Sequence, residues 1–173
     1  MKTSADSLKK SADALNDSSL WEKKKIKKKD EKTGEEIEVE DYDWDKITKA
    51  VKSFVEDYND VVKEAGESNT KDVLRNASWM TGMTDKNSNM LAKIGITIGK
   101  GNKLELDEDA LKQADISSLK TVFTGYNSFV SKISQKATGI SNAANRASAT
   151  YTNNGTYSKT DSLLTSSKID EEV

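Results

Sequence analysis

Glycines beside lysines, followed by a cluster of carboxylates, make one stretch of this chain the first candidate for binding chemistry. The stretch covers residues 94–109 and reads IGITIGKGNKLELDED. A phosphate-binding P-loop ends in Gly-Lys-Ser/Thr, but no hydroxyl residue follows either lysine here. A dinucleotide-binding turn leads directly into a helix, and no helical pattern follows these glycines. An EF-hand loop spaces its oxygen ligands around a central glycine, whereas residues 107–109 are contiguous acids. The spacing therefore argues against all three kinds of site.

The same stretch fits a β-hairpin that leads into a capped helix. Isoleucines alternate with small or polar residues over 94–98, leucines alternate over 104–106, and residues 99–102 supply the turn. Asp107 is then a helix N-cap, and the acids after it suit the positive end of the helix dipole. We expect this motif to be structural and to bind no ligand.

The composition removes most catalytic chemistry. The 173 residues include no cysteine and no histidine, which excludes thiol nucleophiles, disulfides, and imidazole or thiolate metal ligands. Neighbouring carboxylates such as Glu105 and Asp107 mean little in a chain with 29 acidic residues. We therefore expect no enzymatic activity, no catalytic or metal-binding residues, no cofactor and no small-molecule substrate.

The charge and hydropathy patterns give no sign of nucleic-acid or membrane binding. The formal net charge is -2, and 27 basic residues are mixed with the acids. No apolar run approaches the roughly 20 residues of a membrane-spanning helix, and the N-terminus lacks the apolar region of a cleavable signal peptide. We expect neither nucleic acid nor membrane as a partner, and an exported chain would need a route without such a signal.

The backbone pattern indicates a mainly α-helical protein. Proline is absent and glycine is scarce, which permits long helices. The low apolar share, 34%, favours narrow apolar stripes on elongated helices over a compact sheet protein. We expect one helix to be closed by Gly66 and the next to stop at Gly82. Apolar periodicity predicts helices over about 4–17, 44–65, 70–83, 108–114, 117–123 and 126–151.

The predicted fold is an elongated helical bundle with long antiparallel helices and one or two small β-hairpins. Residues 1–151 form one helical domain in this prediction, and residues 152–173 form a polar, mobile C-terminal tail. The expected N-cap of the longest early helix is Asp43, because it directly precedes the apolar periodicity that begins at Trp44.

A charged segment interrupts the helices near the N-terminus. Lys23–Lys29 is a basic run and Glu35–Asp41 an acidic run, with a turn between them. We expect a hairpin arm over about 21–41 that sets the basic strand across from the acidic one. The lysines could bind an anionic partner, or the arm could be a solvated ribbon whose charges neutralise each other. The adjoining opposite charges favour the second interpretation.

The last predicted helix carries a nearly continuous heptad seam, which starts at Tyr126 and becomes small towards its end. Small side chains let two helices approach closely but bury little area, so we expect loose packing unless a second chain covers the seam. The candidate seam for a partner helix consists of Ala137, Ile140, Ala144, Ala147 and Tyr151.

Four segments of the chain form an ordered set: AVKSFVEDYNDVV at 50–62, LAKIGITI at 91–98, LELDEDAL at 104–111 and VFTG at 122–125. Their order and spacing resemble the C-terminal region of the flagellar capping protein, the hook-associated protein 2 family. The resemblance covers about residues 44–130 and implies the helical leg domain of a filament cap. The family's long N-terminal half, outer β-rich domains and terminal coiled coils are not recognisable here, so we expect a short stand-alone paralogue.

The resemblance implies core residues and no catalytic ones. The positions expected to define the fold are Phe54, Val55, Tyr58, Leu91, Ile94, Ile96, Leu104, Leu106, Leu111 and Phe123.

Two functional hypotheses follow. The family implies a non-enzymatic structural or assembly protein, exported and flagellum-associated, that contacts itself or other flagellar proteins such as flagellin through its helices. The alternative is a soluble binding module, such as a cytoplasmic export chaperone or adaptor, whose alanine-rich seam holds a partner helix. Export distinguishes the two hypotheses.

Overall fold

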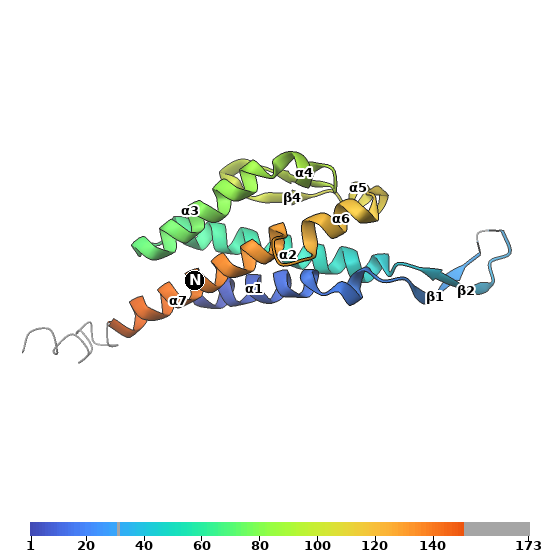
Figure 1. Ribbon diagram of the computed structural model, residues 1–173, viewed down its shortest axis with the longest axis horizontal. Helices are drawn as coiled ribbons and strands as arrows, with labels where there is room; N and C mark the ends of the chain where they lie inside the picture. The colour runs from blue at the N-terminus through green and yellow to red at the C-terminus, as the bar shows by residue number, and fades with distance from the viewer. Residues whose placement is uncertain (31, 151–173) are drawn as a thin grey trace, which may run out of the picture.

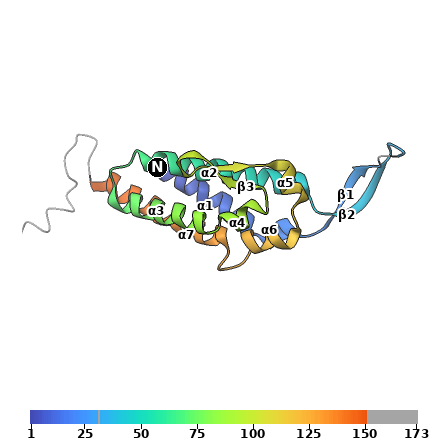
Figure 2. The ribbon, with the colours of Figure 1, turned by 90° about the horizontal axis from the view of Figure 1, so that it is seen from above.

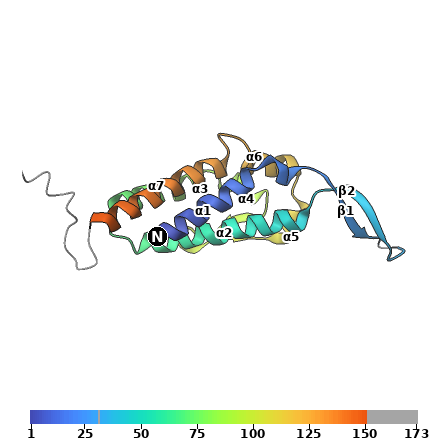
Figure 3. The same cartoon turned by 90° about the horizontal axis from the view of Figure 1, so that it is seen from below.

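The computed structural model describes residues 1–30 and 32–150. Its framework is a bundle of four long helices, and α1 and α3 each contact both α2 and α7. Figure 3 shows α1 running between α2 and α7. The predicted fold class, mainly α-helical with small antiparallel hairpins, is confirmed. The four helices are α1 (Lys2–Asn16), α2 (Trp44–Gly66), α3 (Lys71–Lys86) and α7 (Phe129–Thr150).

Helix α1 forms because its apolar residues recur on one side. All four residues of that stripe are fully buried: Ala5, Leu8, Ala12 and Leu15. A 3₁₀ turn, Ser18–Trp21, extends the stripe. The indole N–H of Trp21 donates to the Leu15 carbonyl at 2.8 Å, and the Trp21 ring stacks on Phe123 with 5.4 Å between ring centroids. The hydrogen bond satisfies the polar atom of a buried aromatic side chain.

Helix α2 begins directly after Asp43, the N-cap predicted from the sequence. The Asp43 carboxylate accepts a hydrogen bond from the Lys46 backbone N–H at 3.1 Å, which satisfies one of the free donors of the first turn. The helix ends at Gly66, as expected. At that end the Glu64 carboxylate pairs with the N-terminal ammonium of Met1 and accepts from the Ser4 hydroxyl. The start of α1 is therefore fastened to the end of α2.

Helix α3 corrects the expectation that Gly82 would stop it. The helix continues through Gly82 to Lys86. Its inner face remains buried beyond the glycine, where the Thr84 hydroxyl donates to the Met80 carbonyl and accepts from the Tyr58 hydroxyl, both at 2.9 Å. This buried contact with α2 outweighs the cost of about 1 kcal/mol of a glycine inside a helix.

The stretch at 94–109 is a hairpin followed by a capped helix, as predicted. Strands β3 (Ile96–Ile98) and β4 (Leu104–Leu106) pair antiparallel. Gly101 and Asn102, with φ of 70° and 60°, make the turn, because both residue types tolerate the left-handed region. The Asp107 carboxylate then accepts from the first backbone N–H groups of α5 (Glu108–Gln113), at 3.0 and 2.9 Å.

This hairpin belongs to a layer that covers one side of the bundle (Figures 1 and 2). The layer also contains the short helices α4 (Ser88–Ala92) and α6 (Ile116–Phe123). Asn59 of α2 holds the hairpin in place, because its side-chain amide donates to the Leu104 carbonyl at 2.9 Å and accepts from the Leu104 N–H at 2.7 Å. The glycine-rich stretch is thus a structural hairpin that packs on α2.

Helix α7 begins three residues later than the heptad pattern of the sequence predicted. We expected the helix and its apolar stripe to start at Tyr126, but the structure starts the helix at Phe129 and leaves Tyr126 83% exposed. Gly125 has φ of 99°, which turns the chain away from helical geometry. The Ser128 hydroxyl accepts from the Ser131 N–H at 3.2 Å and so acts as the cap.

The charged segment near the N-terminus is a second hairpin, as predicted. Strands β1 (Lys24–Lys29) and β2 (Glu36–Asp41) pair antiparallel. The hairpin extends beyond one end of the bundle along its long axis (Figure 1). Each residue of the basic strand β1 is paired with a residue of β2, and most of these β2 residues are acidic. This β1–β2 hairpin is called the arm below.

Candidate interaction surfaces

The chain's own helices cover most of the predicted seam on α7. Ala137 and Ile140 are fully buried, and Ala144 and Ala147 are half-buried, where α7 packs on α1 and α3. Tyr151 lies outside the described residues. A partner helix would reach Ala137 and Ile140 only if a packed helix moved away. The use of this seam by a partner stays a prediction.

Two polar contacts one heptad apart join α1 to α7. The Ser141 hydroxyl donates to the Asp6 carboxylate at 2.5 Å, and the Ser134 hydroxyl donates to the Asp13 carboxylate at 2.6 Å. The antiparallel course of the two helices brings these pairs into register, since seven residues are two helical turns. We call the pairs the Asp–Ser ladder. It adds directional contacts to the apolar packing of α1 on α7.

Lysines on α1 support both carboxylates of the ladder. Hydrogen bonds from Lys2 and from the serine across the interface hold the pKa of Asp6 below its usual range. Burial alone would raise the pKa of Asp13, but hydrogen bonds from Lys9 and its partner serine outweigh burial and lower that pKa. Both carboxylates are therefore held in the charged, accepting form.

Apolar periodicity does not reveal the ladder, but the sequence contains a signal for it. A Lys-x-x-x-Asp pattern occurs at Lys2 and again at Lys9, seven residues later. Ser134 and Ser141 have the same spacing on α7. What the sequence does not show is that these two repeats face each other.

Close approach of α3 and α7 depends on one glycine. A Cβ atom at Gly139 would lie 2.8 Å from the Asn76 side-chain oxygen, so a larger residue would displace Asn76 or separate the helices. Nearby, the Lys136 ammonium lies 4.3 Å from the centroid of the Trp79 ring, a cation–π contact. Trp79 is 43% exposed, so this contact lies at the surface of the bundle.

The ten positions expected to define the fold lie mainly in the interior. Nine of them are buried, and Leu106 is half-buried against the same core. They come from α2, α4, the turn after α4, the β3–β4 hairpin, α5 and α6. The buried nine are Phe54, Val55, Tyr58, Leu91, Ile94, Ile96, Leu104, Leu111 and Phe123.

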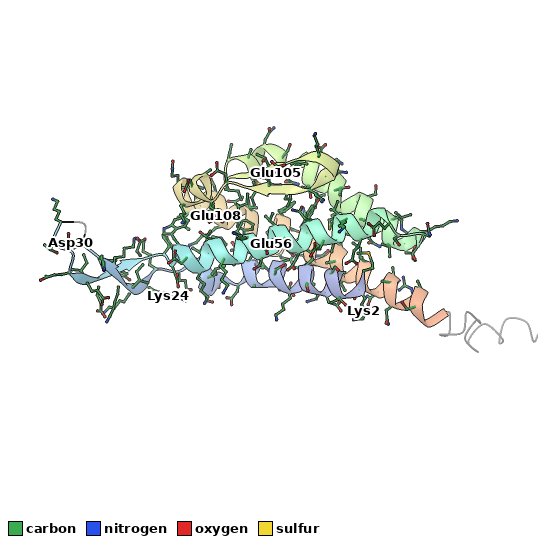
Figure 4. All side chains as sticks on the ribbon, turned by 180° about the vertical axis from the view of Figure 1, so that it is seen from behind. Lys2, Lys24, Asp30, Glu56, Glu105 and Glu108 are labelled. Carbon is green, nitrogen blue, oxygen red and sulfur yellow. The ribbon has the colours of Figure 1, made fainter. Side chains whose placement is uncertain are left out.

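The arm presents two different faces, because directly opposed residues in a hairpin share a face. On one face each lysine lies opposite a glutamate: Lys25↔Glu40, Lys27↔Glu38 and Lys29↔Glu36. The other face carries Ile26↔Val39, flanked by Lys24↔Asp41 and Lys28↔Ile37. Figure 4 shows the side chains of both strands of the arm, with Lys24 near the bundle and Asp30 at the far end.

A hollow lies where the mixed face meets the bundle. Its volume is about 290 Å³, and its lining includes Ile26, Tyr42 and Trp44. The two aromatic rings meet edge to face at 6.3 Å. Ile37, farther along the same face, is 40% exposed. The arm therefore offers apolar surface as well as charge.

Residues 1–30 and 32–150 contain no group of three or more acidic side chains close enough to hold a metal ion. None of the described helices is long and apolar enough to cross a membrane.

The family of the chain is decided by residues 65–171, which match the family model described as flagellar hook-associated protein 2 C-terminus. The chain belongs to this family. The comparisons with curated proteins and with solved structures gave no match. Membership in the hook-associated protein 2 family gives the chain a structural role related to the flagellar cap.

The hook-associated protein 2 match covers more than half of the chain and can be located on the structure. It begins at the end of α2 and includes α3, the β3–β4 hairpin and α7. It therefore starts after the segment at 50–62 and continues through the residues expected to form a polar tail. The arm and α1 lie before the matched region.

Proposed function

We propose that this chain is an exported structural protein of flagellar cap assembly that acts through protein–protein contacts and performs no catalysis. Its partners in this proposal are further copies of itself and other flagellar proteins such as flagellin. The observation that carries the proposal is the family match over residues 65–171.

The contacts inside the bundle support this proposal over the chaperone alternative. A chaperone that holds a partner helix on α7 needs a free seam, yet Ala137 and Ile140 are fully buried. The Asp–Ser ladder holds α1 on that side of α7. Releasing the seam would break these hydrogen bonds and expose core side chains, which costs free energy.

Localisation in the bacterium that encodes the chain tests the proposal. An epitope-tagged copy should appear in sheared filaments, with immunogold label at the filament tips, because a cap component must leave the cell. A strain without a working flagellar export apparatus should retain the chain inside the cell. Deletion of the gene should release unassembled flagellin into the medium, and the wild-type gene should reverse this.

Retention in the cytoplasm of cells with working flagella would contradict the proposal. Co-purification of such retained protein with an exported flagellar protein would support the chaperone alternative instead. A cytoplasmic enzyme measured in the same fractions controls for cell lysis.

A further inference from the structure

The arm has two free edges. Among the described residues its sheet contains only β1 and β2, and the arm extends beyond the bundle, so no helix covers it (Figures 1 and 2). The outer edge of each strand therefore presents backbone N–H and C=O groups that can pair with another strand. A two-stranded hairpin is only marginally stable alone, so an added strand would stabilise it.

The two edges carry opposite charge. Strand β1 has the sequence KKIKKK and strand β2 the sequence EIEVED. Ion pairs inside the arm use part of this charge: Lys27–Glu36 at 3.7 Å and Lys28–Asp41 at 2.5 Å. Lys25 and Lys29 have no ion pair with any described residue. Charged edges repel like edges, which limits aggregation, but a basic edge attracts an acidic one.

We propose that the arm is a self-association site, in which the acidic strand β2 of a second copy pairs antiparallel with the basic strand β1 of the first. The proposal deepens the self-contact of the proposed function and rests on it for its biological setting. The added β2 strand would run in the same direction as the first copy's own β2. Each β1 would then have an acidic strand on both sides, and each β2 a basic strand on both sides.

A second copy fits this surface better than a foreign partner of one charge. A purely acidic partner matches β1 but is repelled by β2, and a purely basic partner has the opposite problem. The arm itself carries both charges on separate edges. Because different edges meet, the contact is head-to-tail, so it would repeat from copy to copy and close into a ring or continue as a filament.

The apolar side chains agree with the same pairing. In the arm, Ile26 and Val39 are directly opposed on the mixed face. A neighbouring β2 in the corresponding register would place its own Val39 beside Ile26, which extends one apolar row across the copies. The hollow beside Tyr42 and Trp44, which Ile26 also lines, lies at the bundle end of the arm and contains the charged residues Lys27, Lys28, Asp43 and Asp45 as well. Aromatic side chains of this kind are common anchors at protein interfaces.

Disulfide formation between copies tests the direction of pairing. The chain has no cysteine, so two full-length variants, Lys27→Cys and Glu38→Cys, each carry a single thiol. Mixed under mild oxidation, they should form the mixed dimer about tenfold more than either homodimer, against about twofold for random pairing, because only unlike edges attract. Homodimers in excess, or monomers at every concentration, would overturn the proposal.

Inverted charges give a second, independent test. The variant with Lys25, Lys27 and Lys29 changed to Glu and Glu36, Glu38 and Glu40 changed to Lys keeps opposite charges across its own hairpin. It should self-associate as the wild type does. Its β1 is repelled by β2 of the wild type and its β2 by β1 of the wild type, so the β1–β2 contact should not form between the two proteins. Sedimentation velocity of each protein and of a labelled mixture measures this.

Co-assembly of wild-type and inverted chains as extensive as the self-association of either would show that β1–β2 pairing does not make the contact. The half-inverted variant K25E/K27E/K29E, with two acidic edges, should remain monomeric while circular dichroism shows an intact helical bundle. Association of that variant at the wild-type level would also contradict the proposal.

The outcomes separate this inference from the proposed function. A monomeric chain that still reaches filament tips would overturn only edge pairing. A chain that pairs through its arms but stays in the cytoplasm would overturn only the flagellar role.

Discussion

At the scale of single residues, Gly95 is the position where backbone geometry most restricts the sequence. Its φ is 80°, and an added Cβ would lie 2.7 Å from the Asp107 carbonyl oxygen and 2.9 Å from the Leu111 nitrogen. Both are backbone atoms at the start of α5. The Gly95 carbonyl also accepts from the Asp107 N–H at 2.8 Å. A glycine that first suggested a ligand loop instead permits close packing of two chain segments.

Gly95→Ala should therefore lower the free energy of unfolding by about 3 kcal/mol, since left-handed strain and a backbone clash add together. Gly101→Ala is the matched control. Gly101 has φ of 70°, but nothing lies within 4 Å of an added Cβ, so strain alone should cost about 1 kcal/mol. Urea denaturation measures both, and equal losses would contradict the clash.

Two buried threonines differ in the partners of their hydroxyl groups. Among the described groups, the Thr48 hydroxyl has no hydrogen-bond partner. The Thr84 hydroxyl accepts from Tyr58 and donates to Met80. Burial raises the pKa of Tyr58 to about 12, so the phenol stays protonated and donates at neutral pH.

Valine has the shape of threonine without the hydroxyl, so the same substitution should have opposite effects at these sites. Thr48→Val should raise the free energy of unfolding by about 1 kcal/mol, because it removes an unsatisfied buried group. Thr84→Val should lower it by about 1–3 kcal/mol, because the Tyr58 hydroxyl loses its acceptor. Urea denaturation measures both variants. Destabilisation by Thr48→Val would mean that its hydroxyl is satisfied.

At the scale of elements, the Asp–Ser ladder makes the contact of α1 with α7 sensitive to acid. The pKa values of Asp6 and Asp13 are both lowered on folding. A carboxyl of this kind adds stability that is fully present above its unfolded pKa, about 3.9. That stability is lost as the pH falls through the folded pKa, because protonation ends the ion pairs with lysine.

The free energy of unfolding should therefore decrease below about pH 4, and the double variant D6N/D13N should decrease less steeply. An asparagine still accepts from the serine across the interface but cannot titrate. Asp60→Asn is the control, because Asp60 is exposed and has no ion pair with a described residue. Urea midpoints from pH 2 to 7 measure the slopes. Equal slopes for the wild type and the double variant would contradict the role of the ladder.

At the scale of the whole molecule, the bundle and the arm are separable in energy. The core cluster draws residues from every long helix and from the layer over α2, but Ile26, Ile37 and Val39 of the arm are outside it. Trp21, just before the arm, is inside it and stacks on Phe123. On this side the hydrophobic core of the bundle therefore ends at Trp21, and the strands of the arm contribute no side chain to it.

Replacement of residues 25–40 by Gly-Gly should change the free energy of unfolding of the bundle by less than about 0.5 kcal/mol, because no core side chain is lost. Lys24 and Asp41 are paired neighbours, so a short turn can join them. Thermal and urea denaturation measure the effect. A loss of several kcal/mol would show that the arm supports the bundle.

Local patterns in the sequence determined much of this molecule. The spacing of Ala5, Leu8, Ala12 and Leu15 predicted α1, Asp43 and Asp107 predicted two helix starts, and the opposed charge runs predicted the arm. Each of these features depends on residues within a few positions of one another, where propensity, capping and charge act directly.

Only the tertiary structure decided the features that join distant segments. Gly82 lies inside α3 because Thr84 bonds Tyr58 of α2, and the seam of α7 is covered because α1 carries carboxylates in register with its serines. Sequence spacing places each group on a face of its own helix, but it does not say which helix that face meets. Long-range packing makes that choice, and it also placed Gly95 in tight contact with the Asp107 and Leu111 backbone atoms.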